Sequence, residues 1–284
     1  MAVCRGGAGR GRCAAHVGEP ADTAFARGRK RHAKTGKTDS RHLRQLLAEG
    51  RLPECWIPPA QILECRALLE TYHDLRREHT AWIQRIHAVF FHQGAPALGE
   101  GALRTEAALA ALREAAAVHL SPAGQLQIAT ALDMLAALEA RMDMLRHQLL
   151  DTARHLTGAR VLADRLYGVG PVSALALTCW LGGAGRFSSS RKAVRFAGLD
   201  VTVYSSDGKR SPGHLSRQGP EIMRWVVYEA GKTHARASAP GHGYYAAVKD
   251  RKDGKIAALS QARKIIRRAC RILAELGDDA LATV

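Results

Sequence analysis

The sequence predicts a mainly α-helical protein, and three observations support that prediction. Alanine and leucine are abundant, while aromatic residues make up 5% of the 284 residues, a composition that favours helices. Two long stretches, 60–92 and 121–149, carry apolar residues at spacings of three and four, which is the pattern of an amphipathic helix. Gly94 and Pro96 break the pattern after the first stretch, as residues that end helices do.

We expect the two long helices to form an antiparallel coiled-coil arm over residues 60–157. Their apolar seams, within 62–90 and 128–149, repeat at a period close to 3.5, which is typical of coiled coils. Ser121 is placed to cap the second helix and is followed by proline, a favoured residue in a first helical turn. The alanine-rich stretch 102–118 supplies a further helix between them. The arm is also expected to join copies of the chain into a homo-oligomer.

The segments outside the arm are expected to range from disordered to helical. Residues 1–32 are rich in glycine, arginine and alanine without a sustained period, so we expect disorder or weak order there. Asp39 or Ser40 can cap a short helix that runs to Glu49. Beyond the arm, a C-terminal domain over 158–276 precedes a tail, 277–284. Its expected helices are 171–181, 188–197, 220–234 and 255–275, with a polar loop at 199–217 that carries two short strands around 201–204.

The charge distribution points to a nucleic-acid partner. The net charge is +16, and an excess this large favours a polyanion. Residues 186–284 carry 19 Lys and Arg against 9 Asp and Glu, a net of +10, whereas residues 61–185 carry 11 against 12, a net of −1.

No apolar run reaches the roughly 18 residues that span a bilayer, and the N-terminus lacks an apolar signal core. We therefore expect a cytoplasmic protein without a membrane partner.

Two motifs in the C-terminal domain can engage phosphodiesters. Gly168-Val169-Gly170 has the form of a helix-hairpin-helix turn, in which backbone N–H groups at a helix N-terminus face a phosphate. Ser205 and Ser206 precede a cationic run, and a serine can attack a phosphodiester when cations stabilise the transition state. An ordinary turn rich in Ser, Asp and Gly has the same composition, and any tight turn can contain two glycines. The expected nucleic-acid contacts are Gly168, Gly170, Lys209, Arg210, His214, Arg217 and Arg224.

In this order and spacing the C-terminal motifs resemble the DEDD insertion-sequence transposases, also called bridge recombinases (the IS-one-ten group). The resemblance covers about residues 33–274. The pieces that carry it are Leu166-Tyr167-Gly168-Val169-Gly170-Pro171, Arg186-Phe187, Phe196-Ala197-Gly198-Leu199, Ser205-Ser206-Asp207-Gly208-Lys209-Arg210, Ser216-Arg217-Gln218-Gly219 and Met223-Arg224.

The resemblance implies a serine nucleophile that forms a covalent bond with DNA, and a structured guide RNA as a second partner. Counted from Gly198-Leu199, the family's serine falls on Ser206, while Ser205 stays a second candidate because Val201 and Asp207 replace the family's Pro and Gly.

The resemblance also implies an RNase H-like (RuvC-like) domain with four acidic residues that bind Mg²⁺. In this sequence the family's fourth acidic residue corresponds to Asp39, which is the expected metal ligand and a catalytic residue. The family's third acidic residue is replaced by Gly36. Residues 33–59 are therefore expected to be a remnant of that domain, and 1–32 a segment outside the family. We expect an N-terminally truncated or degenerate member.

The resulting hypothesis is a DNA transposase or recombinase of an insertion sequence, impaired in this chain. The alternative is a catalytically inactive, nucleic-acid-binding transposase fragment.

Overall fold

A computed structural model describes residues 2–5, 14–18, 23, 36–99, 101–202, 204–206, 209–211 and 213–283. The chain divides into two compact units, Met1–Pro59 and Ala60–Val284. The described part is mainly helical, as the sequence predicts, with ten α-helices and two small two-stranded sheets.

The first unit holds a two-stranded sheet and one helix among its described residues. Strand β1 (Ala2–Arg5) pairs antiparallel with β2 (Ala14–Val17), although no strand was expected within 1–32. Helix α2 (Gly36–Ala48) buries Leu43 and Leu46. Two four-residue strands and one helix do not define an RNase H-like sheet, so the expected remnant of that domain stays a prediction.

The predicted start of this helix is wrong by three residues. Helix α2 already includes Gly36, so Asp39 lies in its first turn and Ser40 follows it within the helix, and neither caps it. The Ser40 hydroxyl donates a hydrogen bond of 2.8 Å to the Gly36 carbonyl, the bond that serine makes inside a helix. A serine can therefore satisfy its hydroxyl within the helix as well as at its cap.

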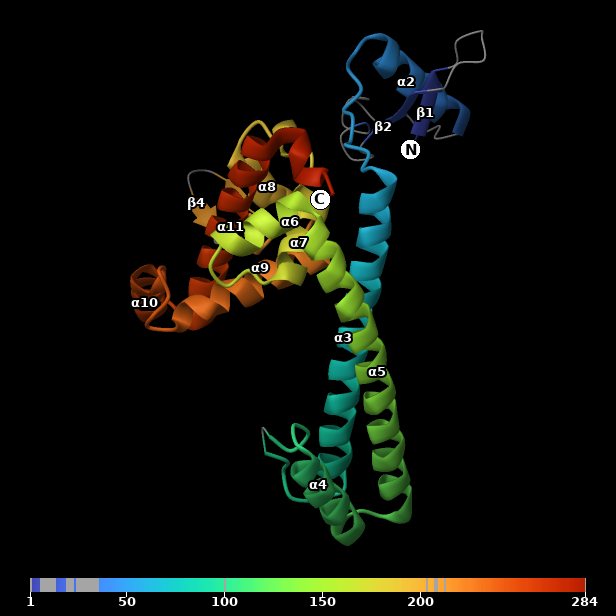
Figure 1. The fold of residues 1–284 in the computed structure, drawn as a ribbon, viewed down its shortest axis with the longest axis vertical. Helices are drawn as coiled ribbons and strands as arrows, with labels where there is room; N and C mark the ends of the chain where they lie inside the picture. Colours follow the sequence, from blue (N-terminus) through green and yellow to red (C-terminus); the bar gives the residue numbers. More distant parts are fainter. Residues whose placement is uncertain are drawn as a thin grey trace. The chain divides into compact units, whose positions relative to one another are not determined.

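Two long helices form the antiparallel pair at the centre of the second unit (Figure 1). Helix α3 (Ala60–His92) has the predicted bounds, and α5 (Pro122–His155) begins where Ser121 caps it, its hydroxyl accepting from the Gly124 N–H at 3.2 Å. Their buried seams include Ile62, Leu69, Ile86, Phe90, Ile128, Leu135 and Leu149. The paired helices are thus confirmed, while supercoiling and self-association stay predictions.

Helix α4 (Glu106–His119) packs at the end of the pair where α3 ends and α5 begins (Figure 1). It starts four residues later than expected because the Thr105 hydroxyl accepts from the Ala108 N–H and sets the cap there. Leu112 and Ala116 join Ile86 and Leu135 in one buried cluster.

The C-terminal part packs short helices around α7 (Pro171–Leu181), which is buried from Ala174 to its end. Helix α11 (Gly254–Leu276) lies against α8, α9 and α10 and also contacts α6 and α7. The remaining elements are α6 (Thr157–Arg165), η1 (Ala184–Arg186), α8 (Ser190–Phe196), α9 (Glu221–Lys232), η2 (Thr233–Ala235), α10 (His242–Arg251) and η3 (Gly277–Leu281).

Two C-terminal predictions need correction. Helix α8 begins at Ser190, later than the expected 188, and the Ser189 side chain makes no capping bond. The strands expected around 201–204 are instead β3 (Tyr204–Ser206) and β4 (Lys209–Ser211). Within the described ranges, no helix is both long enough and apolar enough to cross a membrane.

Candidate nucleic-acid interface

The expected polar loop is a hairpin whose root is held by backbone hydrogen bonds. The Arg217 N–H donates to the Gly198 carbonyl at 3.1 Å, and the Ser216 N–H donates to the Asp200 carbonyl at 3.0 Å. Val201 and Leu215 form the next antiparallel bridge. The two segments therefore run antiparallel from residue 198 upward and lead into β3 and β4.

The register of β3 and β4 sets each candidate serine opposite a cationic residue. Ser206 is paired with Lys209 and Ser205 with Arg210. Directly opposite residues of an antiparallel pair have Cα atoms about 4.5–5.5 Å apart. Asp207 and Gly208, which connect the strands, lie outside the described residues. The hairpin thus brings both serines and the two expected cations together at backbone level.

Two glycines at the root of this hairpin let neighbouring backbone segments approach each other closely. A Cβ on Gly198, whose φ is +68°, would lie 2.8 Å from the Gln218 nitrogen and carbonyl oxygen. A Cβ on Gly219 would lie 2.1 Å from the Phe196 carbonyl oxygen. Arg217 also adopts a positive φ of 52°, an uncommon conformation for a residue with a side chain. The root is consequently a specific structure, unlike a generic polar turn.

The other expected contact residues play different roles around the root of the hairpin. The Arg224 guanidinium donates to the Gly219 carbonyl at 2.6 Å, so it braces the backbone where the hairpin ends. The Ser216 hydroxyl donates to the Asp200 carboxylate. His214 and Arg217 are exposed, and the His214 carbonyl accepts from the Thr202 N–H at 2.8 Å. The imidazole of His214 and the guanidinium of Arg217 therefore face solvent, where a phosphate can reach them.

The two glycines of the helix-hairpin-helix-like turn are not equivalent. Gly168 has φ +79°, and a Cβ there would lie 2.2 Å from the Thr233 hydroxyl oxygen, so this glycine is required by packing against the end of α9. Gly170 precedes α7 as its N-cap residue, and a Cβ there would meet nothing within 4 Å. Of the two, Gly170 leaves room for an anion beside the helix N-terminus.

The turn borders a hollow of about 580 Å³ that is lined by residues 163–170. Tyr167 is partly exposed there, with its ring centroid 5.2 Å from that of His234. No side chain caps α7, and the dipole of a helix favours negative charge at its N-terminus. The turn therefore has the form of a phosphate contact.

Comparison with known proteins identifies the segment that carries this geometry. Residues 161–246 match the model of the Transposase IS116/IS110/IS902 family. This segment is therefore similar to that transposase family. The chain is also 26% identical over 219 residues to a probable family 20 transposase of Pseudomonas aeruginosa, a match that covers 74% of the chain and 63% of that protein. The match thus spans less than two thirds of the length of that relative.

The family segment contains both the glycine turn and the serine hairpin. It ends within α10 and so excludes α11, which supplies a contact that sequence reasoning missed. The Arg263 Nε donates to the Leu199 carbonyl at 2.8 Å. These residues lie 64 positions apart in the chain, and the spacing of residues within either segment gives no signal of their contact.

Asp39, the expected metal ligand, belongs to the first unit, whereas both serines belong to the second. It lies in the first turn of α2 and is partly buried. Among the described residues, no group of three or more His, Cys, Asp or Glu side chains is arranged to hold a metal ion. Mg²⁺ takes several converging oxygen ligands, so the described residues do not fit the four-acid site that the resemblance implies.

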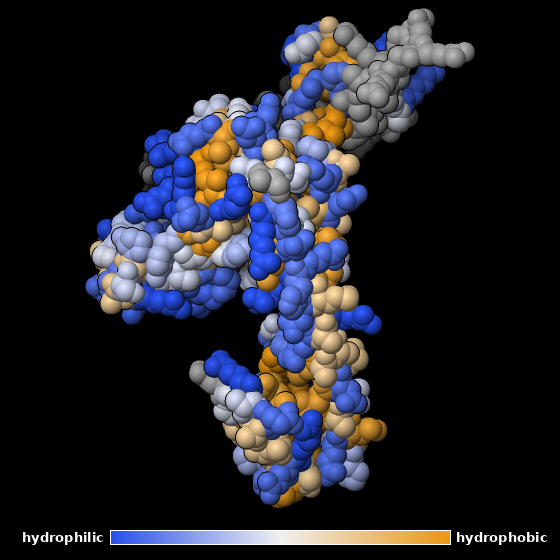
Figure 2. Space-filling model, in the orientation of Figure 1, coloured by the Kyte–Doolittle hydropathy of each residue, from blue (hydrophilic) through white to orange (hydrophobic). Residues whose placement is uncertain are grey.

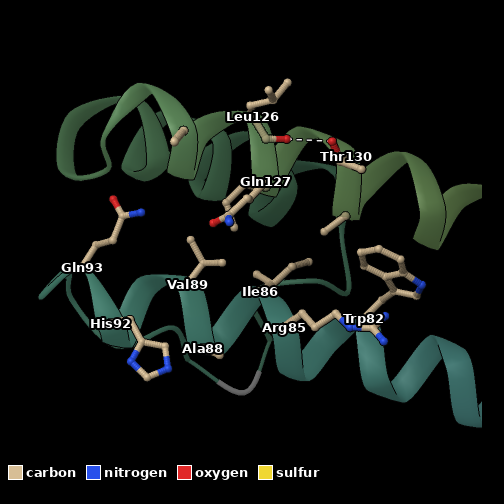
Figure 3. A pocket seen from close by; sticks show the side chains of 13 residues that line it. Trp82, Arg85, Ile86, Ala88, Val89, His92, Gln93, Leu126, Gln127 and Thr130 are labelled. Carbon is tan, nitrogen blue, oxygen red and sulfur yellow. Dashed lines mark hydrogen bonds between the residues drawn. The ribbon is translucent and has the colours of Figure 1, made fainter.

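A second hollow lies on the long helices and includes no residue of the hairpin. It measures about 830 Å³ and is lined by Trp82, Ile86 and Val89 of α3 and by Leu126 and Gln127 of α5 (Figure 3). Figure 2 shows hydrophobic residues gathered where α3, α4 and α5 meet. Most of the lining is apolar, and the hollow brings together no group of titratable side chains suited to phosphodiester chemistry.

Proposed function

We propose that this chain is a DNA transposase or recombinase of an insertion sequence, with Ser206 as the nucleophile. The observation that carries the proposal is the hairpin register within the family-matched segment, where Ser206 is paired with Lys209. Ser206 also has the spacing from Gly198-Leu199 at which the family carries its serine. Ser205, paired with Arg210, is the second candidate.

The proposed step is a transesterification at phosphorus. The Ser206 hydroxyl oxygen forms a bond to phosphorus, the bond between phosphorus and one bridging DNA oxygen breaks, and the serine proton leaves to solvent or a base. The departing DNA oxygen takes up a proton as an alcohol. Cations beside the attacked phosphate stabilise the extra negative charge of the pentavalent transition state. Lys209, Arg210 and Arg217 supply that charge near the serine.

The cleaved DNA is rejoined by the reverse reaction. A DNA hydroxyl attacks the phosphoserine, and the Ser206 oxygen leaves and regains a proton. Because bonds to phosphorus are exchanged and not hydrolysed, the energy of the phosphodiester is conserved through the covalent intermediate. No step is assigned to Mg²⁺, since the described residues do not complete its ligand set.

The partners in this proposal are DNA, a structured guide RNA and further copies of the chain. The family resemblance supports the two nucleic acids, and the net charge of +10 over residues 186–284 agrees with them. The paired helices α3 and α5 support assembly through a coiled coil, because their exposed faces can pack against a second pair. The reactions are proposed to take place in the cytoplasm.

Trapping the covalent intermediate tests the proposal. The chain is incubated with fluorescent duplex DNA that carries the ends of its own element, with transcribed flanking RNA, and the adduct is resolved on a denaturing protein gel. The expected result is a labelled protein band that Ser206→Ala abolishes and Ser205→Ala retains. The reverse pattern would move the nucleophile to Ser205.

A catalytically inactive, nucleic-acid-binding role is the second candidate, and Gly36 at an acidic position of the family favours it. In that case wild type and Ser206→Ala bind DNA equally and neither forms an adduct. An adduct in the wild type alone excludes this role.

A further inference from the structure

The side of α11 next to the hairpin root carries half-buried cations. Arg263 lies four residues and Lys264 three residues before Arg267, so each is a helix-surface neighbour of Arg267, and all three are partly buried. Helix α11 packs against α8 and α10, which encloses these side chains more than ordinary surface cations.

Arg263 is fixed to the strand that leads into the serine hairpin. Its Nε donates to the Leu199 carbonyl at 2.8 Å, one residue before the Asp200–Ser216 pair. Burial lowers the pKa of Arg263 and the nearby Arg267 lowers it further, while Asp200 and Tyr244 oppose them. The nearby positive charge of Arg267 therefore adds to the free-energy cost of keeping the Arg263 guanidinium charged.

One donor of the Arg267 guanidinium lacks the partner that a buried donor normally has. Its Nε is buried and has no hydrogen-bond partner among the described residues. Within the same part of the chain, neither Arg263 nor Arg267 forms an ion pair with a carboxylate. A buried donor without a partner costs about 1–3 kcal/mol, and like charges four residues apart on a helix repel. An anion bound at this face would offset the repulsion between the two guanidinium groups.

Lys264 and Tyr244 form the border of the same face. The Lys264 ammonium lies 3.0 Å from the centroid of the Tyr244 ring, and the Tyr244 hydroxyl is bonded to the Ser260 hydroxyl at 2.6 Å. Tyr244 is 40% exposed. Cations interleaved with an exposed aromatic ring are typical of surfaces that follow a nucleic-acid backbone.

We propose that Arg263 and Arg267 form a phosphodiester-binding subsite at the root of the serine hairpin, in which Arg267 contacts a backbone phosphate and Arg263 positions the hairpin. The ligand class is the phosphodiester backbone of DNA or RNA, and planar guanidinium groups suit its oxygens. The positioning part rests on the proposed function, because it concerns the serine's reaction. The binding part stands without it.

Salt-dependent binding tests the subsite. The full chain is titrated into fluorescent 30-base-pair DNA and, separately, single-stranded RNA, at several salt concentrations. Arg267→Gln is compared with Lys255→Gln, which removes an exposed charge from the same helix. We expect Arg267→Gln to weaken binding about tenfold or more and to lower the salt slope by about 1.

The two nucleic acids distinguish the source of the phosphate. Weaker binding of DNA alone, RNA alone or both supports the subsite and identifies which strand it holds. If Arg267→Gln matches Lys255→Gln with both nucleic acids, the subsite is excluded. Circular dichroism and thermal unfolding establish that each variant is folded.

The positioning role of Arg263 has a separate readout, the rate of adduct formation at saturating DNA. Arg263→Gln is expected to lower that rate about tenfold or more, since the Leu199 carbonyl loses its partner. Arg263→Lys should leave the rate reduced, because lysine keeps the charge but lacks the planar Nε–H group. A wild-type rate in Arg263→Gln, or full rescue by lysine, would overturn this role. If no variant forms an adduct, the proposed function fails while the binding comparison still decides the subsite.

Discussion

At the scale of single residues, the glycine turn separates a packing requirement from a possible ligand contact. Gly168 combines φ +79° with a Cβ position 2.2 Å from the Thr233 hydroxyl oxygen, which is itself bonded to the Ala230 carbonyl. Gly168→Ala should therefore lower the free energy of unfolding by about 2 kcal/mol or more. Gly170→Ala has open space and an ordinary φ of −76°, so it should cost under about 1 kcal/mol. Urea unfolding measures both, and equal losses would contradict the packing role of Gly168.

A pair of thiols gives a second prediction at this scale. A hydrogen bond from the Cys179 thiol of α7 lowers the pKa of Cys65 on α3 to about 7, while the same bond and burial raise the pKa of Cys179. The thiolate is the reactive form and predominates above the pKa. Alkylation of Cys65 by iodoacetamide should thus rise with a midpoint near pH 7.

The matched control for the thiol pair is Cys179→Ala, which removes the donor. Its Cys65 midpoint should move up toward the ordinary value of 9.0, as peptide mapping of the alkylated residue would reveal. An unchanged midpoint would mean that the Cys179 thiol does not stabilise the Cys65 thiolate.

At the scale of elements, the stability of the long helix pair depends on its buried seam and not on its exposed apolar residues. Leu135 is 6% exposed in the cluster that joins α3, α4 and α5, whereas Leu126 is 69% exposed on the same helix. Leu135→Ala should cost about 2–4 kcal/mol by removing packed methyl groups, and Leu126→Ala much less than 1 kcal/mol. Urea midpoints of the two variants compare these losses, and similar shifts would argue against a seam centred on Leu135.

The elements that the sequence predicts well are those with local causes. Helix α3 follows from its apolar period alone, and α5 from the Ser121 cap and the following proline. Helices α6 and α10 are not predicted because they are only nine and ten residues long, too short to display a sustained apolar period. The start of α2 was misplaced because Asp39 and Ser40 suit a helix interior as well as a cap.

The features of the candidate site also divide into those that have local causes in the sequence and those that do not. The choice of Ser206 rests on the family's motif counted from Gly198-Leu199 along the chain, and it stays a prediction. The pairing of Ser206 with Lys209 depends on strand register, and the contact of Arg263 with Leu199 joins separate segments. Neither is encoded in any local period or motif.

At the scale of the whole molecule, charge is concentrated where the site lies and not spread evenly. Residues 186–284 carry a net of +10 and residues 61–185 a net of −1. At physiological ionic strength, screening limits the reach of exposed charges to about 8 Å. Nucleic-acid binding should therefore depend on which cations are changed, beyond the total charge of +16.

Two double variants with the same change in net charge test this dependence. Arg191→Glu with Lys192→Glu alters exposed residues of α8, and Arg141→Glu with Arg146→Glu alters exposed residues of α5. Since each phosphate contact contributes to the salt slope, the α8 pair should weaken duplex binding about tenfold or more and reduce the slope, whereas the α5 pair should change affinity about twofold or less. Equal weakening would mean that total charge alone governs binding. The contrast matters because the proposed reaction requires the attacked strand to be held at the serine hairpin, and the proposal gives cations on the long helices no part in positioning that strand.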